Sequence, residues 1–249
     1  MQSKVFLSVV VPAFNEAVNF SGKLSQITEY LNKQKYHWEI VVVNDGSSDN
    51  TLELLNEFSQ SNKGVRVVDS LHQGKAGSII RGVRESVGDY IIFSDMDQAT
   101  PISESARILT LLQSGYDIVI GSRSKREGAP VVRQILAYGM VILRTLLLRL
   151  PYRDTQCGFK GFSRKAAQRI FPVLEKIHPP HEIHGPAVNP GFDVELLYLG
   201  RKLGFRIAQT PVTWHHIKSD RVRFFKDAVS GVTELLLVRW RSVTNAYQL

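Results

Sequence analysis

Residues 38–51 read Trp-Glu-Ile-Val-Val-Val-Asn-Asp-Gly-Ser-Ser-Asp-Asn-Thr, and this stretch decides the fold class. Its unbroken run of β-branched residues at 40–43 predicts a strand that is buried on both faces. The polar turn after the strand leads to a helix capped by Asp49 or Asn50. The predicted core face of that helix consists of Leu52, Leu55 and Phe58. A buried strand, a polar loop and an amphipathic helix in succession indicate one unit of a parallel α/β sheet.

The same succession recurs regularly to about Gly121. A strand at 7–11 runs into Pro12-Ala13-Phe14-Asn15-Glu16, and residues 73–78 form a glycine-containing loop that enters a helix. That helix is predicted to bury Ile79, Ile80 and Val83. Parallel strands place the loops at their carboxyl ends along one edge of the sheet, where α/β proteins bind ligands. We therefore expect the polar loops to gather at that edge.

Asp95 and Asp97 directly follow the apolar run at 90–94. In an extended Asp-x-Asp segment both carboxylates project from the same face, while Met96 points the other way into packing. Hard oxygen ligands of this kind suit Mg²⁺ or Mn²⁺, which take one or two carboxylates and leave other positions to water and substrate phosphates. A solvated acidic turn is the alternative, but the polar loops upstream favour a metal site.

Five segments in this order and spacing, VVVPAFNE, VVVNDGSSDNT, HQGKAGS, FSDMDQATP and GSR, resemble the inverting family 2 glycosyltransferases of GT-A fold. Residues 154–160 and 191–198 resemble the polyprenyl-phosphate branch of that family, the dolichyl-phosphate β-glucosyltransferases and mannosyltransferases. The resemblance covers about Leu7 to Trp214. It implies a GT-A-like α/β fold, a mostly parallel sheet flanked by helices. The charge and apolar spacing of the C-terminal residues add an amphipathic basic C-terminal helix.

The resemblance also implies a division of the chain. Residues 1–214 would form the glycosyltransferase domain, with a nucleotide-binding half at 1–122 and an acceptor half at 123–214. Residues 215–249 would form a basic amphipathic C-terminal extension.

The donor site implied by the resemblance takes its residues from the first three loops. Pro12, Phe14 and Glu16 would line the nucleotide pocket. Asp45 would hydrogen-bond the base, and Lys75 would lie near the nucleotide, although an ordinary lysine at a helix start is an equal alternative.

The resemblance assigns the diphosphate to later residues. Asp95 and Asp97 would address the ribose and the metal-bridged diphosphate, with Asp97 as the direct ligand of Mg²⁺ or Mn²⁺. Arg123 would meet the diphosphate or the acceptor phosphate as a bidentate donor. Mannosyltransferases of this class commonly carry a glutamine two residues past the second aspartate. This chain has Ala99 there and Gln98 displaced by one, so we assign Gln98 no metal role, and the departure favours the glucosyl relatives.

Candidate residues for the acceptor or its phosphate are Arg133, Asp154, Lys160 and Asp193. A phosphate acceptor has its second pKa near 6, so it is largely a dianion at neutral pH and needs no general base. A sugar hydroxyl would need one, and Asp154 and Asp193 are the carboxylates available for that role.

The expected reaction is transfer of a hexose, with inversion, from UDP-glucose or, less favoured, GDP-mannose to a polyprenyl phosphate. Two alternatives stay open: a family 2 transferase that acts on a sugar hydroxyl, and a non-catalytic sugar-nucleotide-binding module. A Rossmann domain would need G-x-G-x-x-G after the first strand, and a P-loop would need another order of residues at 74–78, so neither is favoured.

The net charge of +8 is unevenly distributed. The net charges of successive segments are −4 for residues 1–122, +9 for 123–169, −3 for 170–200 and +6 for 201–249. Basic clusters suit nucleic acid or anionic lipid. The sequence shows no nucleic-acid-binding motif, so we expect no nucleic-acid partner and favour an anionic membrane surface.

Two predicted helices support a membrane surface. Residues 131–149 are strongly apolar but contain Arg133 and Arg144, which are eleven residues apart and would share one face. The uncharged runs are too short to span a bilayer, so this helix is interfacial or packed in the core. A helix at about 222–241 places apolar residues at helical spacing, namely Phe225, Val229, Val232, Leu236 and Trp240. Trp240 lies between two arginines, as interfacial anchors do, whereas a stripe that covers the core is the alternative.

The segment 178–191 contains four prolines and three histidines, His178, His181 and His184, and cannot be a regular element. We expect a loop over the acceptor site rather than a zinc site. The single cysteine, Cys157, is predicted to be a packed thiol in a strand, and it fits a reducing compartment. The N-terminus enters a strand without a signal region, so we expect a cytoplasmic protein that is peripheral on the cytosolic face of a membrane.

Overall fold

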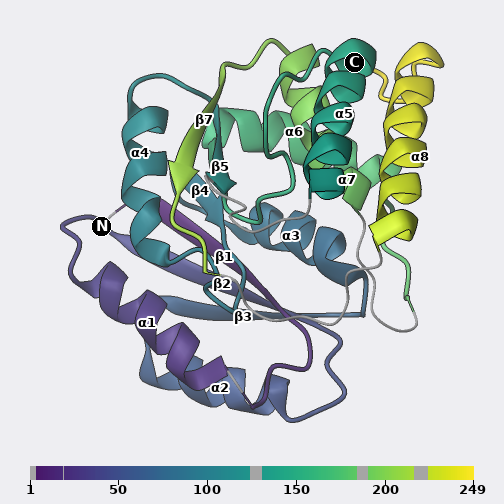
Figure 1. The fold of residues 1–249 in the computed structure, drawn as a ribbon. Helices are drawn as coiled ribbons and strands as arrows, with labels where there is room; N and C mark the ends of the chain where they lie inside the picture. The colour runs from purple at the N-terminus through teal and green to yellow at the C-terminus, as the bar shows by residue number, and fades with distance from the viewer. Residues whose placement is uncertain (1–3, 19, 124–130, 184–189, 216–223) are drawn as a thin grey trace.

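The structure is a computed structural model, and it describes residues 4–18, 20–123, 131–183, 190–215 and 224–249 (Figure 1). Within these residues seven strands form one sheet in the order β3-β2-β1-β4-β6-β5-β7. The strands are β1 (Leu7–Ala13), β2 (Trp38–Asp45), β3 (Val65–Ser70), β4 (Tyr90–Phe93), β5 (Ile118–Arg123), β6 (Lys160–Ser163) and β7 (Ile207–Val212). Neighbouring strands are parallel except at β6, which is antiparallel to both β4 and β5. The prediction of a mostly parallel α/β sheet is confirmed.

Helices cover both faces of the sheet. They are α1 (Phe20–Asn32), α2 (Thr51–Ser61), α3 (Gly74–Glu85), α4 (Ser105–Gln113), α5 (Val131–Leu148), α6 (Arg164–Ile177), α7 (Pro190–Lys202) and α8 (Phe224–Val243), with a 3₁₀ turn η1 (Ile102–Glu104) before α4. Alternate valines of β1 point to opposite faces of the sheet, so each face is covered by its own layer of helices. Val10 packs in the cluster that contains α3, α6 and α7, whereas Val9 and Val11 pack in the cluster that contains α1, α2 and α4.

The local predictions for the first half are largely confirmed. Leu55 is buried, and the predicted inward face of α3 is buried at Ile79, Ile80 and Val83. At the start of α2 the Asp49 carboxylate accepts a hydrogen bond from the Thr51 amide at 3.0 Å, so Asp49 rather than Asn50 provides the side-chain contact.

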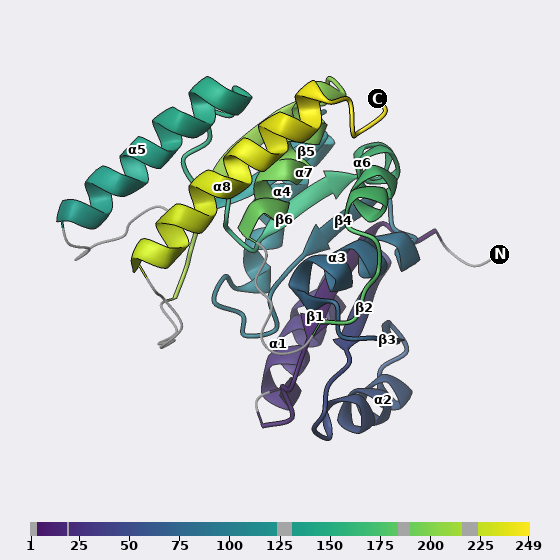
Figure 2. The same cartoon turned by 90° about the vertical axis from the view of Figure 1, so that its right-hand side faces the viewer.

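Helices α5 and α8 lie side by side outside α7, as Figure 2 shows. Leu235 and Val238 of α8 pack into the core, whereas Leu236 and Trp240 are exposed. Leu236 and Trp240 therefore do not belong to a stripe that covers the core, and contact of this face with lipid stays a prediction. Among the residues that the structure describes, no helix combines the length and the apolar character that a bilayer crossing requires.

Arg144 of α5 is buried rather than part of an interfacial surface. Its side chain is 7% exposed, and its guanidinium donates to the Leu150 carbonyl, the Thr155 hydroxyl and the Tyr152 carbonyl. Arg144 thus fastens the end of α5 to the loop that follows it. The side chain of Arg133 lies outside the described residues.

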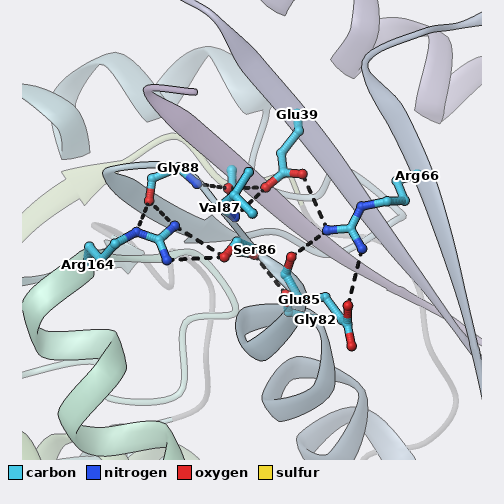
Figure 3. Close-up of polar contacts among 9 residues, drawn as sticks. Glu39, Arg66, Gly82, Glu85, Ser86, Val87, Gly88 and Arg164 are labelled. Carbon is cyan, nitrogen blue, oxygen red and sulfur yellow. Dashed lines mark hydrogen bonds and ion pairs between the residues drawn. The ribbon is translucent and has the colours of Figure 1, made fainter. Parts of the chain in front are cut away.

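A polar network centred on Glu39 closes the amino-terminal edge of the sheet (Figure 3). Glu39 Oε1 accepts from the Ser8 hydroxyl at 2.6 Å and from the Val87 amide at 2.7 Å. Ser8 Oγ in turn accepts from the Gly88 amide at 2.8 Å, and Arg66 lies 3.4 Å from Glu39 Oε2. We call these residues, together with Arg164, the amino-edge network.

Arg164 joins the amino-edge network from α6. Its guanidinium donates to the carbonyl groups of Ser86 and Gly88 in the turn between α3 and β4. Each charged group of this network therefore has a partner, and the turn that starts β4 is fixed from both sides.

Candidate functional site

The loops after β1 and β2 are bound to each other at the carboxyl edge of the sheet. The Asn15 amide donates to Ser47 Oγ at 3.0 Å, and Asn15 Oδ1 accepts from the Ser48 amide at 2.9 Å. The Glu16 amide donates to Thr51 Oγ1 at 2.8 Å. These contacts fix the two loops as one wall of the predicted donor site.

Pro12, Phe14 and Glu16 lie along that wall. Pro12 is within β1, the other two follow the strand, and all three are partly exposed. The structure thus brings together the residues predicted to line the nucleotide pocket.

Asp45, at the end of β2, is 3% exposed. Its Oδ1 accepts from the Gln73 amide at 2.8 Å, and its Oδ2 lies 2.8 Å from His72 Nδ1. The residue predicted to read the base is therefore already oriented by the loop after β3.

The Asp95-Met96-Asp97 segment is a turn, so the expectation of an extended conformation is wrong. The Gln98 amide donates to the Asp95 carbonyl at 3.2 Å, and Gln98 has a positive φ of 54°. The Gln98 side chain locks this turn, since its amide nitrogen donates to the Ser94 hydroxyl and the Asp95 carbonyl. Met96 is buried at 3%, as predicted.

Lys75 and Gly158 surround the Asp95 carboxylate. The Lys75 ammonium forms an ion pair with Asp95 Oδ1. A side chain at Gly158 would collide with both groups, because its Cβ would lie 2.2 Å from Asp95 Oδ2 and 3.0 Å from Lys75 Nζ. Gly158 is therefore part of the site, since only glycine leaves room for this ion pair.

The local charges shift two pKa values. Burial raises the pKa of Asp97; the Ala99 amide at 2.9 Å opposes this effect, and the Asp95 charge adds to it. Burial lowers the pKa of Lys75, but the nearby carboxylates, above all Asp95, outweigh it and raise that pKa above its ordinary value. The carboxyl edge therefore carries Lys75 in its charged form beside two carboxylates. The fold disfavours the charge on one of them, Asp97.

Arg123 forms a two-point ion pair with Asp154. Its Nε lies 2.6 Å from Asp154 Oδ2 and its Nη2 lies 2.7 Å from Oδ1. The guanidinium also lies over the Trp214 ring, 5.7 Å from the centroid. The predicted bidentate donor and one predicted base therefore bind each other in this structure.

Lys160 is fully buried. Its ammonium donates to the Cys157 carbonyl at 2.5 Å and to Asp193 Oδ1 at 2.6 Å, and it lies 5.4 Å from the centre of the Phe93 ring. The structure thus places Lys160 beneath the edge, as a link between β6 and α7, rather than on an acceptor surface. Cys157 is buried as predicted, but in the loop before β6 and not in a strand.

The two described histidines of the proline-rich segment have separate partners. His178 Nε2 lies 2.5 Å from the buried Glu195 carboxylate, whereas His181 is exposed and His184 lies outside the described residues. The Ile183 amide donates to the His72 carbonyl at 2.8 Å, so this segment contacts the end of the site near Asp45.

The chain beyond β7 returns to the Asp95–Asp97 turn, which we call the carboxylate turn. The His215 amide donates to the Ala99 carbonyl at 2.8 Å, two residues after Asp97. This contact brings the end of the predicted catalytic domain beside the predicted metal ligands.

Sequence reasoning missed three residues of this site, namely His72, Gln98 as a structural lock, and Gly158. Gly158 carried a detectable signal, because a glycine next to a polar loop often marks a close approach. The role of His72 depends on a contact with a loop 27 residues away, which no local pattern reveals.

Asp95 and Asp97 fit the predicted divalent cation. Mg²⁺ and Mn²⁺ need one or two carboxylates together with substrate phosphates, and this pair has the right donor atoms. Burial and, to a smaller extent, the Asp95 charge raise the pKa of Asp97, and a bound cation would offset both effects. Within the described residues no group of three or more histidine, cysteine or acidic side chains could hold a metal, so the pair would depend on the substrate for further ligands.

Comparisons with known proteins identify the family and the fold. The family model "Glycosyl transferase family 2" matches residues 8–171. The dolichyl-phosphate beta-glucosyltransferase of Dictyostelium discoideum is 31% identical over 98% of this chain and 77% of its own length. The human protein of the same name is 33% identical over 98% and 78%.

Solved structures share the fold. Glucosyl-3-phosphoglycerate synthase from Mycobacterium tuberculosis, in complex with Mn²⁺, UDP-glucose and phosphoglyceric acid, matches with a TM-score of 0.63 at 19% identity, over 94% of this chain and 80% of that one. Mannosyl-3-phosphoglycerate synthase from Rubrobacter xylanophilus matches with a TM-score of 0.62 at 17% identity, over 97% and 75%.

The sheet and the helices on both of its faces form the GT-A fold that these solved structures share. The chain belongs to glycosyl transferase family 2 and is a hexosyltransferase.

Proposed function

We propose that this enzyme transfers a hexose, with inversion, from a nucleotide sugar to a polyprenyl phosphate of the dolichyl type at a membrane surface. UDP-glucose is the favoured donor and GDP-mannose the alternative. The relatives named dolichyl-phosphate beta-glucosyltransferase, at 30–33% identity over 98% of the chain, support the acceptor and the sugar. Ala99, at the position where related mannosyltransferases carry glutamine, also favours glucose.

The observation that carries the proposal is the Asp95–Asp97 turn beside Lys75. Departure of a nucleoside diphosphate concentrates negative charge, and stabilising that charge is the main requirement of the reaction. A divalent cation held by Asp95 and Asp97 would supply Lewis-acid stabilisation of the diphosphate. Lys75 adds a fixed positive charge, and Gly158 keeps this lysine and Asp95 in contact.

The state of the two candidate bases supports a phosphate acceptor. Asp154 is bound to Arg123 and Asp193 to Lys160, so both carboxylates are already engaged by cations. A phosphate dianion attacks without a base, whereas a hydroxyl group would need one. The guanidinium has five N–H donors, of which the contact with Asp154 uses two, so Arg123 can also donate to a phosphate. Arg123 therefore keeps its proposed role as a phosphate partner.

The exposed apolar side chains of α5 and α8 support the membrane surface. Tyr138, Ile142 and Leu146 recur every four residues on α5 and are exposed. On α8 the exposed apolar side chains include Leu236, Leu237, Trp240 and Val243. We call these seven residues the apolar face, and we propose that it contacts lipid on the cytosolic face of a membrane.

The activity test combines labelled UDP-glucose or GDP-mannose with Mn²⁺ or Mg²⁺ and one of three acceptors: dolichyl phosphate, dolichol, or a free sugar. We expect label in the lipid fraction with UDP-glucose and dolichyl phosphate, and retention of that activity in Asp154→Asn and Asp193→Asn. Loss of a general base would cost about 10²–10⁴-fold. Collapse of either variant together with preference for a hydroxyl acceptor would favour the sugar-hydroxyl alternative, and nucleotide binding without transfer would favour a binding module.

The membrane test measures sedimentation with phosphatidylcholine vesicles, with and without phosphatidylserine. A Leu146→Ser/Trp240→Ser variant should bind less, while Glu57→Ser, an exposed change on α2 away from the apolar face, should bind as the wild type does. Equal binding of all three proteins would contradict the proposed surface.

A further inference from the structure

Three loops of the donor wall meet at a single side chain, His72. Its ring stacks on Phe14, with centroids 4.1 Å apart and planes 11° apart. Its Nδ1 lies 2.8 Å from Asp45 Oδ2 and 3.0 Å from the Asp45 carbonyl oxygen. His72 itself belongs to the loop between β3 and α3, so the loops after β1, β2 and β3 are joined here.

The two oxygens of Asp45 determine where the His72 ring carries its proton. A carboxylate oxygen and a carbonyl oxygen are both acceptors, so the nitrogen that faces them must be a donor. Nδ1 is therefore the ring nitrogen that carries a proton toward Asp45. The imidazole thus gives a directed hydrogen bond to the carboxylate.

The backbone around His72 is held in place on both sides. The Gln73 amide donates to Asp45 Oδ1 at 2.8 Å, and the His72 carbonyl accepts from the Ile183 amide at 2.8 Å. Gly46 has a positive φ of 64°, and a Cβ at this position would lie 2.6 Å from the backbone nitrogen of His72. The loop therefore packs against the end of β2 so closely that the His72 ring is fixed relative to Asp45.

We propose that His72 is a positioning residue that fixes the Asp45 carboxylate for the donor base and thereby sets the selectivity among bases. An ionised carboxylate has about four acceptor positions, and the His72 ring and the Gln73 amide occupy two of them. The remaining positions can accept a ring N–H but repel a ring lone pair. This role rests on the proposed function, in which Asp45 contacts the base.

The proposal makes a definite distinction between two pyrimidines. Uracil carries a hydrogen on N3, whereas cytosine of the same size carries a lone pair there. A carboxylate held in one orientation accepts the former and opposes the latter, because a buried acceptor that faces another acceptor stays unpaired. A carboxylate free to rotate would discriminate less between them.

The experiment measures binding of UDP and CDP by calorimetry in the presence of Mn²⁺, without any acceptor. The variants are His72→Ala, His72→Asn and His72→Gln, with Leu71→Ala, an exposed neighbour, as the matched control. The asparagine amide nitrogen occupies nearly the position of Nδ1, while the glutamine amide lies one carbon farther out. Thermal unfolding of each variant is recorded alongside.

We expect His72→Ala to weaken UDP binding about 10-fold and to reduce the preference for UDP over CDP, because a hydrogen bond to a charged group is lost. His72→Asn should restore both quantities to within about 3-fold, and His72→Gln should not. In transfer assays the KM for the donor should rise in His72→Ala while kcat at saturating donor is retained. If His72→Ala does not fold, the difference between the asparagine and glutamine variants still tests the role.

An unchanged UDP-to-CDP ratio in His72→Ala, or equal effects of asparagine and glutamine, would overturn the positioning role while leaving the proposed function intact. A wild-type protein that binds UDP no better than CDP would also overturn it. Failure of the wild type to bind UDP, CDP or GDP would overturn the proposed function, and the role of His72 with it.

Discussion

The two edges of the sheet contain the same kinds of side chain but use them differently. At the amino-terminal edge, Glu39 is surrounded by donors from Ser8, Val87 and Arg66, and the cluster is closed (Figure 3). At the carboxyl edge, Asp95 has Lys75 as a partner, but Asp97 is left with a raised pKa beside it.

This difference separates stability from function. A buried carboxylate with all its donors supports the fold, and its loss leaves those donors unpaired. A carboxylate whose charge the fold disfavours does not stabilise the protein at neutral pH. Its presence indicates a role in binding a ligand. We therefore expect substitutions at the amino-terminal edge to change stability and substitutions at the carboxyl edge to change activity.

The largest effect is expected from Asp97→Asn. Because this substitution removes a metal ligand, the transfer rate should fall at least about 100-fold. The midpoint of urea unfolding at neutral pH should stay the same or rise, since the pKa of Asp97 in the fold is already above its ordinary value and the charged form is disfavoured there. A normal rate at saturating Mn²⁺ would refute the metal role.

The next effect concerns the amino-edge network. Glu39→Ala should lower the free energy of unfolding by about 3 kcal/mol, because the Ser8 hydroxyl, the Val87 amide and the Arg66 guanidinium lose their acceptor. The kcat and donor KM of the folded protein should be unchanged. Glu57→Ala on the exposed side of α2 is the control, and a comparable loss of stability there would remove the distinction between the edges.

Arg123→Lys tests the carboxyl edge more gently. Lysine keeps the charge but cannot reproduce the two parallel contacts that Arg123 makes with Asp154, so we expect about a 10-fold loss in kcat/KM for the acceptor. Arg123→Ala should be more severe. Acceptor titrations with both variants measure this, and full activity of Arg123→Lys would show that the planar fork is not used.

The smallest effect is expected from substitutions of Gln98. They separate the contribution of its backbone conformation from that of its side-chain contacts in the carboxylate turn. Gln98→Gly and Gln98→Ala both remove the side-chain contacts to Ser94 and Asp95, but only glycine adopts the positive φ without cost. The glycine variant should be about 1 kcal/mol more stable than the alanine variant in urea unfolding. Equal stabilities would mean that the turn relaxes to another conformation.

The fold was predictable because its signals are local. The valine runs of β1 and β2 and the helical spacing after each loop define strand, loop and helix without reference to distant residues. The polar loops gather because parallel strands have their carboxyl ends at the same edge of the sheet. The lone antiparallel strand, β6, does not disturb that prediction because it joins the sheet between β4 and β5.

The rest depended on partners far apart in the sequence. A lysine is normally exposed, and the burial of Lys160 requires Asp193, which lies 33 residues away. The Asp45–His72 pair, 27 residues apart, has the same origin, whereas Arg144 is buried by partners 6 to 11 residues away in the loop after α5. The turn at Asp95 could not be read from Asp-x-Asp alone, because Gln98 holds it through contacts that form only in the folded protein.

The reversed direction of β6 also bears on how such a site can diversify. The loops after β1, β2, β3 and β4 leave parallel strands at the carboxyl edge, whereas residues 154–158 arrive there before β6 begins. This segment can change in length or composition without shifting the register of the strands that carry the donor residues. Such changes must keep Gly158, because only glycine leaves room for the contact between Asp95 and Lys75.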